Sequence, residues 1–283
     1  MSALAAVHTR RRAFATAALP LIGIDHIPFV VKDLEQAAET YRRLGFVIKP
    51  GRFHADGIRN SHIKFPDGAG IELITAPAAT DDLTRRYTRM ISQGEGPASV
   101  SFHSSSEPAL IAAAESIDEP YSLEGNLMTF RNESLRWLFL SEGSNRSPTD
   151  RPEHFAHPNG ASATLAVWIA CDDHDRGRAL RLFRSLGATV GQKVVRVPDP
   201  LRTTVATIEN GGEVIFLPIK RQLLAGRPIV GIVFRTRDLS AADQALRSAG
   251  VKDLESVETP AYRSLLVSPH DTCGVWLEFR ERR

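Results

Sequence analysis

The stretch that decides the fold is Gly23-Ile24-Asp25-His26-Ile27-Pro28-Phe29-Val30-Val31, followed by Asp33-Leu34 and then by Leu44-Gly45. The run from Ile24 to Val31 is mostly apolar and predicts a strand. Apolar residues then recur at helical spacing as far as Leu44. Asp33 is a good N-cap, and Gly45 suits the left-handed position that often follows a helix. We therefore predict a strand followed by a helix over residues 24–45.

The same pattern returns near the end of the chain. Residues 229–234 read as a strand, Asp238-Leu239 opens a helix, and Gly250 closes it at the same separation as in the first copy. Two weaker copies lie between them, with strands at 98–103 and 164–171 and helices at 107–116 and 173–186. An internal repeat of this kind determines the fold class.

Three strand-like runs follow each predicted helix. In the first copy they are residues 46–48, 61–65 and 70–75, and in the last copy they lie near 254–257, 265–268 and 275–279. The chain therefore reads as an α+β protein of four βαβββ modules. We predict a flexible tail at 1–22, a first half of two modules at 23–143, a polar linker at 144–160 and a second half of two modules at 161–283.

Composition excludes several function classes. Of the 283 residues, 42% are hydrophobic and 24% are charged, which is typical of a soluble globular protein. The net charge of +2 comes with no basic stripe, so we expect no nucleic-acid partner. No apolar run is long enough to span a bilayer, so we expect no membrane partner. The two cysteines, Cys171 and Cys273, form no disulfide framework and favour a reducing compartment.

The N-terminus bears on localisation. Arg11-Arg12-Ala13-Phe14 is similar to the start of a twin-arginine export signal. The apolar stretch after it is short and runs directly into the first predicted strand, which leaves little room for a cleavage site. We expect a cytoplasmic protein, with export as the alternative.

The order of elements resembles the glyoxalase-like branch of the vicinal oxygen chelate superfamily. The residues that carry the resemblance are Gly23-Ile24-Asp25-His26, Leu44-Gly45-Phe46, Asn60, Phe65-Pro66, Ile71-Glu72-Leu73-Ile74 and His157-Pro158-Asn159-Gly160-Ala161. The resemblance implies paired, curled mixed β-sheets with helices on the outside, each pair enclosing a cavity. This fold hosts lyases, epimerases, dioxygenases and drug-sequestering proteins, so it does not by itself select a reaction.

Strand alternation indicates which side chains face that cavity. Successive side chains on a strand point to opposite faces, and the bulky apolar positions of the first module should pack on its helix. The residues between them then share the concave face: His26, Asn60, His62, Lys64 and Glu72. Buried polar groups without partners are costly, so this face is too polar to be an ordinary inner sheet surface.

The resemblance also implies a metal site. Superfamily sites use a first-strand His and a last-strand Glu from each of two modules, and His26 and Glu72 occupy these positions in module one. Module four offers Glu278, while the remaining positions hold Ser99, Ala166, Gly231 and apolar residues. Three ligands, His26, Glu72 and Glu278, would meet if module one faced module four. If module one faced module two, His103 or Ser101 would contribute instead.

These residues support several functions. We predict a divalent metal (Zn, Fe, Mn or Ni) held by His26, Glu72 and Glu278, with Glu72 moving a proton. The absence of any cofactor is left equally open. Asn60 and His62 would line the ligand pocket, as would His157 on the resemblance alone. Purely structural roles remain open for His26 as a hydrogen-bonded histidine and for Glu278 as a partner of an arginine.

Three readings of the function follow. The first is a metal-dependent lyase or isomerase of glyoxalase type acting on a small molecule. The second is a metal-free small-molecule binding or drug-sequestering protein. The third is an extradiol-type dioxygenase, which is less favoured because modules three and four lack the second histidine that such enzymes carry there. A homodimer is an open alternative for self-association.

Overall fold

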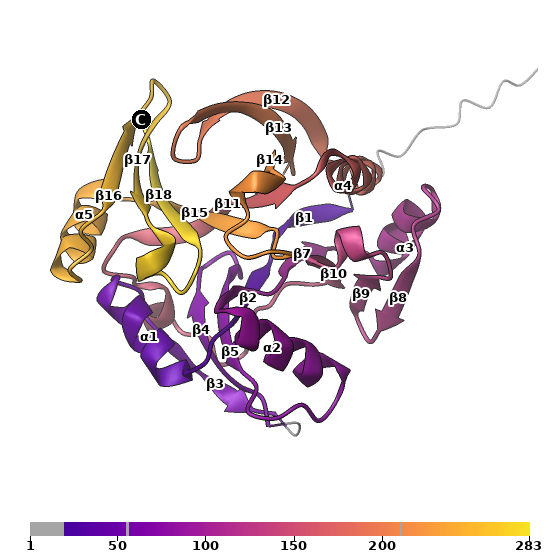
Figure 1. Ribbon diagram of the computed structural model, residues 1–283, viewed down its shortest axis with the longest axis horizontal. Helices are drawn as coiled ribbons and strands as arrows, with labels where there is room; N and C mark the ends of the chain where they lie inside the picture. The colour runs from indigo at the N-terminus through magenta and orange to yellow at the C-terminus, as the bar shows by residue number, and fades with distance from the viewer. Residues whose placement is uncertain (1–19, 55–56, 210) are drawn as a thin grey trace, which may run out of the picture.

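The computed structural model describes residues 20–54, 57–209 and 211–283. Within this part of the chain, four βαβββ modules follow one another, as predicted (Figure 1). Module one comprises β2 (His26–Val30), α1 (Leu34–Arg43), β3 (Lys49–Phe53), β4 (Arg59–Lys64) and β5 (Gly70–Thr75). Module two comprises β7 (Val100–Ser104), α3 (Glu107–Glu115), β8 (Tyr121–Glu124), β9 (Leu127–Phe130) and β10 (Leu138–Glu142).

The second half repeats this order. Module three comprises β11 (Ala161–Cys171), α4 (Asp173–Ser185), β12 (Thr189–Arg196), β13 (Pro200–Thr207) and β14 (Glu213–Pro218). Module four comprises β15 (Ile229–Thr236), α5 (Leu239–Ser248), β16 (Leu254–Glu258), β17 (Tyr262–Val267) and β18 (Trp276–Arg282). Between modules one and two lie α2 (Asp82–Gln93) and β6 (Gly96–Pro97), and β1 (Leu21–Ile24) precedes module one. The predicted tail thus ends earlier than residue 22, because Leu21 pairs with Ser104 of β7.

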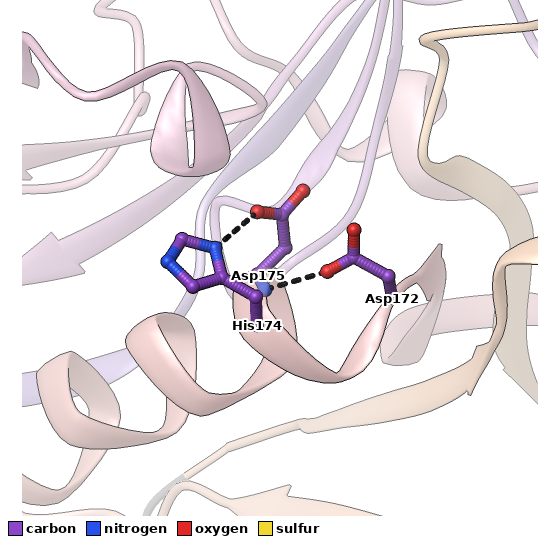
Figure 2. Close-up of side chains that lie close together, drawn as sticks. All are labelled: Asp172, His174 and Asp175. Atoms are coloured by element: carbon purple, nitrogen blue, oxygen red, sulfur yellow. Dashed lines mark hydrogen bonds and ion pairs between the residues drawn. The ribbon is translucent and has the colours of Figure 1, made fainter.

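Three of the four module helices are capped by an aspartate, and Ser106 caps α3. Asp33 accepts hydrogen bonds from the backbone N–H groups that follow it at the start of α1, and Asp238 does the same at the start of α5. At the start of α4, Asp172 accepts from the N–H of Asp175 at 2.8 Å, while Asp175 contacts His174 (Figure 2). These caps satisfy N–H groups that have no partner within the helix.

Sheet pairing determines which modules are neighbours. In every module the first strand runs parallel to the last one: β2 with β5, β7 with β10, β11 with β14 and β15 with β18. Modules three and four form one eight-stranded sheet within the described residues, joined by β11 and β15. Modules one and two lie in adjoining sheets, where the Asp25 N–H donates to the Ser101 carbonyl at 2.8 Å. Module one is therefore paired with module two.

The largest apolar core lies on the helix-facing sides of the sheets. Phe46 of module one contacts Phe234 and Phe279 of module four, with ring centroids 5.4 and 5.7 Å apart. The hydroxyl of Tyr41 on α1 donates to the carbonyl of Thr272 at 3.0 Å. Modules one and four thus meet through their helix sides, and their concave faces point away from this contact.

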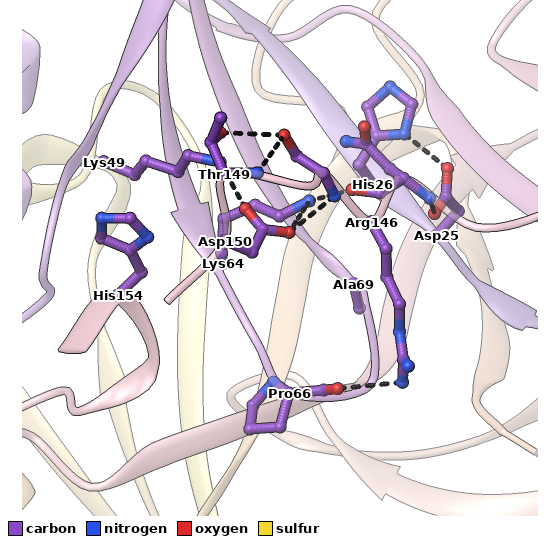
Figure 3. A network of polar contacts seen from close by, with 12 residues as sticks. Asp25, His26, Lys49, Lys64, Pro66, Ala69, Arg146, Thr149, Asp150 and His154 are labelled. Atoms are coloured by element: carbon purple, nitrogen blue, oxygen red, sulfur yellow. Dashed lines mark hydrogen bonds and ion pairs between the residues drawn. The ribbon is translucent and has the colours of Figure 1, made fainter. Parts of the chain in front are cut away.

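The segment predicted to be a polar linker lies against module one (Figure 3). The N–H of Asn145 donates to Asp25 at 2.6 Å, and Arg146 donates to the carbonyl of Pro66 at 3.0 Å. The Lys49 ammonium forms an ion pair with Asp150. This segment therefore covers one edge of the concave face.

None of the helices in the described ranges is long and apolar enough to cross a membrane. The arginine pair at residues 11 and 12 lies outside the described residues.

Candidate active site

The structure brings His26, Asn60 and Glu72 together on the concave face of module one. The Nδ2 atom of Asn60 donates to Oε1 of Glu72 at 2.5 Å. Nε2 of His26 lies 3.7 Å from Oε2 of Glu72. The apolar residues that alternate with them, such as Ile71 and Leu73, are buried in the core on the helix side. Strand alternation therefore predicted that the three side chains share one face of the sheet. The pairing of β2, β4 and β5 sets the distances between them.

The orientation of His26 is fixed by its neighbour in the sequence. Nδ1 of His26 lies 2.7 Å from Oδ2 of Asp25, whose side chain is almost completely buried. A carboxylate can only accept, so Nδ1 carries the hydrogen. In the neutral ring Nε2 then keeps its lone pair, and this atom faces Glu72. A carboxylate behind a histidine is the arrangement that commonly orients metal-binding imidazoles.

Asn60 fixes the orientation of Glu72. Its Oδ1 accepts from the N–H of Arg52 at 2.9 Å, which leaves Nδ2 to face Glu72 and, at 3.4 Å, Nε2 of His54. His62 pairs with Glu72 across β4 and β5 and is only partly buried. Burial lowers the pKa of His62 to about 4, and Glu72 opposes this shift. His62 is therefore neutral at pH 7 and lies beside Glu72 on the concave face.

Module two supplies an aromatic wall to this site. Phe139 follows Leu138 on β10 as Glu72 follows Ile71 on β5, so Phe139 occupies the position of Glu72 in the second module. Its ring packs edge-on against His26, with centroids 5.5 Å apart. By the same register Ser99 stands at the position of His26. The apolar character of this position is visible in the sequence, but its contact with His26 depends on how the two modules pack.

Glu278 does not join this site. Its carboxylate accepts from Nε and Nη2 of Arg280 at 2.8 and 2.9 Å and is 1% exposed within the sheet of modules three and four. The neighbouring residue Phe279 packs on Phe46, so Glu278 points to the opposite face. The expected set of His26, Glu72 and Glu278 is therefore not assembled, because module one pairs with module two.

His157 does not lie on the concave face of module one either. Its Nδ1 accepts from the N–H of Val47 at 3.0 Å, and its Nε2 donates to the carbonyl of Lys64 at 3.0 Å. The ring packs between Phe46 and Phe65, and burial lowers its pKa to about 4. Since both nitrogens bind backbone atoms, the structure gives His157 a structural role in place of the expected ligand contact.

Comparison with known proteins agrees with this architecture. The family model of the glyoxalase-like domain matches residues 24–207. The chain belongs to the glyoxalase-like domain family. No curated protein matches it in sequence.

Solved structures show that the glyoxalase-like protein has the vicinal oxygen chelate fold. A triple mutant of 4-hydroxymandelate synthase from Streptomyces coelicolor has a TM-score of 0.68 and 10% identity, with 93% of each chain covered. A Mn(II)-bound glyoxalase from Novosphingobium aromaticivorans has a TM-score of 0.60 and 12% identity, covering 93% of this chain and 82% of that one.

A fusion of a xylose isomerase-like TIM barrel with 4-hydroxyphenylpyruvate dioxygenase has a TM-score of 0.66 and 14% identity. The alignment covers 93% of this chain and 49% of the fusion protein, so this chain spans about half of its length. At these identities the similarity establishes the fold alone.

One further group of metal-binding residue types occurs in the described part of the glyoxalase-like protein. Asp172, His174 and Asp175 place one ligand atom each within 4.8 Å of one another (Figure 2). Asp172 caps α4, and Asp175 accepts from the hydroxyl of Ser134 at 2.5 Å. The cap and this tertiary contact account for the cluster.

Proposed function

We propose that this protein is a divalent-metal-dependent lyase or isomerase of glyoxalase type, which moves a proton on a small molecule bound at the concave face of module one. The observation that carries the proposal is the pair formed by Nε2 of His26 and the carboxylate of Glu72, 3.7 Å apart. Each member is oriented by its own partner, Asp25 or Asn60. Two side chains held in this way are suited to ligation and to proton transfer.

The residues present fit a divalent ion through two side chains. Metal–ligand distances are about 2.0–2.2 Å for imidazole nitrogen and carboxylate oxygen, so atoms 3.7 Å apart are compatible with one shared ion. Ser99 and Phe139 stand where a second pair of ligands would stand, and Phe139 has no donor atom. The other coordination positions would therefore belong to solvent or substrate oxygens. When bound, such an ion polarises neighbouring substrate oxygens and stabilises an enediolate-like charge.

Glu72 is the residue that would accept the proton. Asn60 donates to one carboxylate oxygen, and the other oxygen faces the site. Neutral His62 lies beside Glu72 and would contact the ligand without adding charge. Phe139 contributes an apolar wall that limits access of water to one side of His26.

The experiment is a metal analysis of protein purified without chelator. We expect close to one divalent ion per chain, lost in His26→Ala and strongly reduced in Glu72→Gln. His270→Ala is the matched control, because this side chain is 92% exposed. His174→Ala tests the surface cluster. Metal that survives His26→Ala and disappears with His174→Ala would contradict the proposal.

The second candidate function is metal-free binding of a small molecule. The contact between Phe139 and His26 favours it, because an aromatic ring occupies the place of a second carboxylate. Protein without metal that melts at a higher temperature in the presence of a small-molecule ligand supports this candidate. An extradiol-type dioxygenase has less support. In the second half Ala166 and Gly231 stand at the positions of His26, and Ile215 stands at the position of Glu72, so these positions offer no metal-binding side chain.

A further inference from the structure

A groove of about 840 Å³ lies where the two halves of the chain meet, next to the site described above. It runs between α2, the start of β7 and the loop that leads from β14 to β15. Four arginines line it: Arg86, Arg89, Arg136 and Arg227. We call it the arginine groove. Phe139, the ring that packs on His26, is also one of its lining residues.

Arg227 brings a buried positive charge to this groove. The side chain is only 6% exposed, and its guanidinium donates to the carbonyls of Pro97 at 2.9 Å and of Met90 and Gly94 at 3.3 Å. No carboxylate of the described residues lies within ion-pair distance of it. These carbonyls satisfy hydrogen bonds but leave the charge without a counter-ion. A buried charge in this state is costly.

Arg86 adds a second charge, on a more exposed side chain. Its Nη2 donates to the carbonyls of Arg136 at 2.8 Å and Ala98 at 3.3 Å, and within the described ranges it has no ion pair. Burial and, to a smaller extent, the nearby charge of Arg86 together lower the pKa of Arg227 to about 10. Two cations that disfavour each other would both be stabilised by an anion placed between them.

The acidic residues of the groove do not supply this anion. Glu133 pairs with Arg136 at 3.4 Å on the surface, and Asp175 is held by Ser134. The groove as a whole therefore keeps an excess of positive charge over the acidic side chains that line it. A guanidinium is well matched to carboxylate and phosphate oxygens.

We propose that the arginine groove binds the carboxylate or phosphate group of a small organic anion beside Arg86 and Arg227, with the apolar part of the molecule directed toward Phe139. This ligand site is separate from the metal and proton-transfer residues, because neither His26 nor Glu72 lines the groove. It stands whether or not the proposed reaction is correct.

Calorimetric titration of the full chain with phenyl phosphate and benzoate tests the site. We expect at least one of these anions to bind, and neutral phenol to bind at least tenfold more weakly. Arg86→Gln should raise the Kd of the binding anion about tenfold, as expected for loss of one charge-assisted hydrogen bond. Arg85→Gln, one residue away on α2 and outside the groove, should leave it unchanged. The relative affinities for phenyl phosphate and benzoate identify phosphate or carboxylate as the preferred group.

Three results would overturn the proposal: no binding of either anion, equal binding of phenol, or equal effects of Arg85→Gln and Arg86→Gln. Arg86→Lys keeps the positive charge and serves as a second variant, which keeps the test informative if Arg86→Gln does not fold. It should bind the anion better than Arg86→Gln does. His26→Ala should bind the anion like the wild type, which separates this outcome from that of the metal analysis.

Discussion

The ring of Phe139 packs edge-on against the imidazole of His26, with the two centroids 5.5 Å apart. Phe139 stands in module two where Glu72 stands in module one, because β10 pairs with β7 as β5 pairs with β2. At this contact module one contributes an imidazole and a carboxylate, and module two contributes an aromatic ring in place of a second carboxylate. This asymmetry would make module one the reactive side of the pair and module two its wall.

The substitution Phe139→Glu should increase metal affinity. It places a carboxylate beside His26, where it can act as a third ligand together with Glu72. We expect Mn²⁺ or Zn²⁺ affinity, measured by competition with a chelating dye, to rise about tenfold. In the control Phe139→Gln, the new side chain has nearly the shape of glutamate but no charge, so metal affinity should rise little. Equal affinities of the two variants would argue against a metal ion at His26.

The substitution Asn60→Ala should weaken both the site and the fold. It removes the hydrogen bonds to Glu72 and to the N–H of Arg52 from a side chain that is 7% exposed. We expect a loss of about 1–3 kcal/mol in the free energy of unfolding, measured in urea, together with reduced metal content. Asn126→Ala is the control, since Asn126 is exposed and should cost less than about 0.5 kcal/mol. Unchanged metal content in Asn60→Ala would show that the orientation of Glu72 is not needed for ligation.

His157 should make stability depend on pH. Its folded pKa of about 4 lies below the unfolded value of 6.5, so the folded state binds fewer protons between these values. Its contribution, about 3 kcal/mol, is present above pH 6.5 and is lost as the pH falls toward 4. The stability gap between wild type and His157→Gln should therefore narrow over this interval in urea unfolding at each pH. His270→Gln is the control, because this side chain is 92% exposed and its replacement should cost little stability. A gap for His157→Gln that does not change with pH would refute the prediction.

Asp150 should hold the segment of residues 144–156 against module one. Its carboxylate pairs with Lys49 and lies 3.9 Å from Lys64, both of which are buried. Asp150→Asn leaves two buried ammonium groups without a carboxylate, which should cost about 2–4 kcal/mol and expose the segment to protease. The exposed pair of Asp82 and Arg85 gives the control, because Asp82→Asn should cost less than about 0.5 kcal/mol. Equal rates of cleavage in the two variants would exclude this role.

Substitution of Glu278 should lower the stability of the fold and leave metal binding unchanged. Glu278→Ala leaves the guanidinium of Arg280 buried without its carboxylate, and we expect a loss of about 3–5 kcal/mol in unfolding free energy. The double change of Glu278→Leu and Arg280→Met should recover much of this loss, because it removes both charges together. Loss of metal in a folded Glu278 variant would show that it does reach the site at His26.

Much of the fold could be predicted because its signals are local. The caps at Asp33 and Asp238 and the closing glycines lie within a few residues of the helices they bound. The shared face of His26, Asn60 and Glu72 follows from the alternation of each strand. Asp25, which orients His26, is adjacent to it in the sequence, and this adjacency was the available signal for its role.

By itself the sequence determined the four modules and the face to which each polar side chain of module one points, since both depend on short-range periodicity. Only the tertiary structure decided that module one pairs with module two, and this pairing separates Glu278 from His26 and brings Phe139 to it. The same holds for His157, whose partners Val47 and Lys64 lie 110 and 93 residues away. Contacts between residues so far apart in the sequence depend on how whole modules pack, and local sequence patterns do not predict which modules pack together.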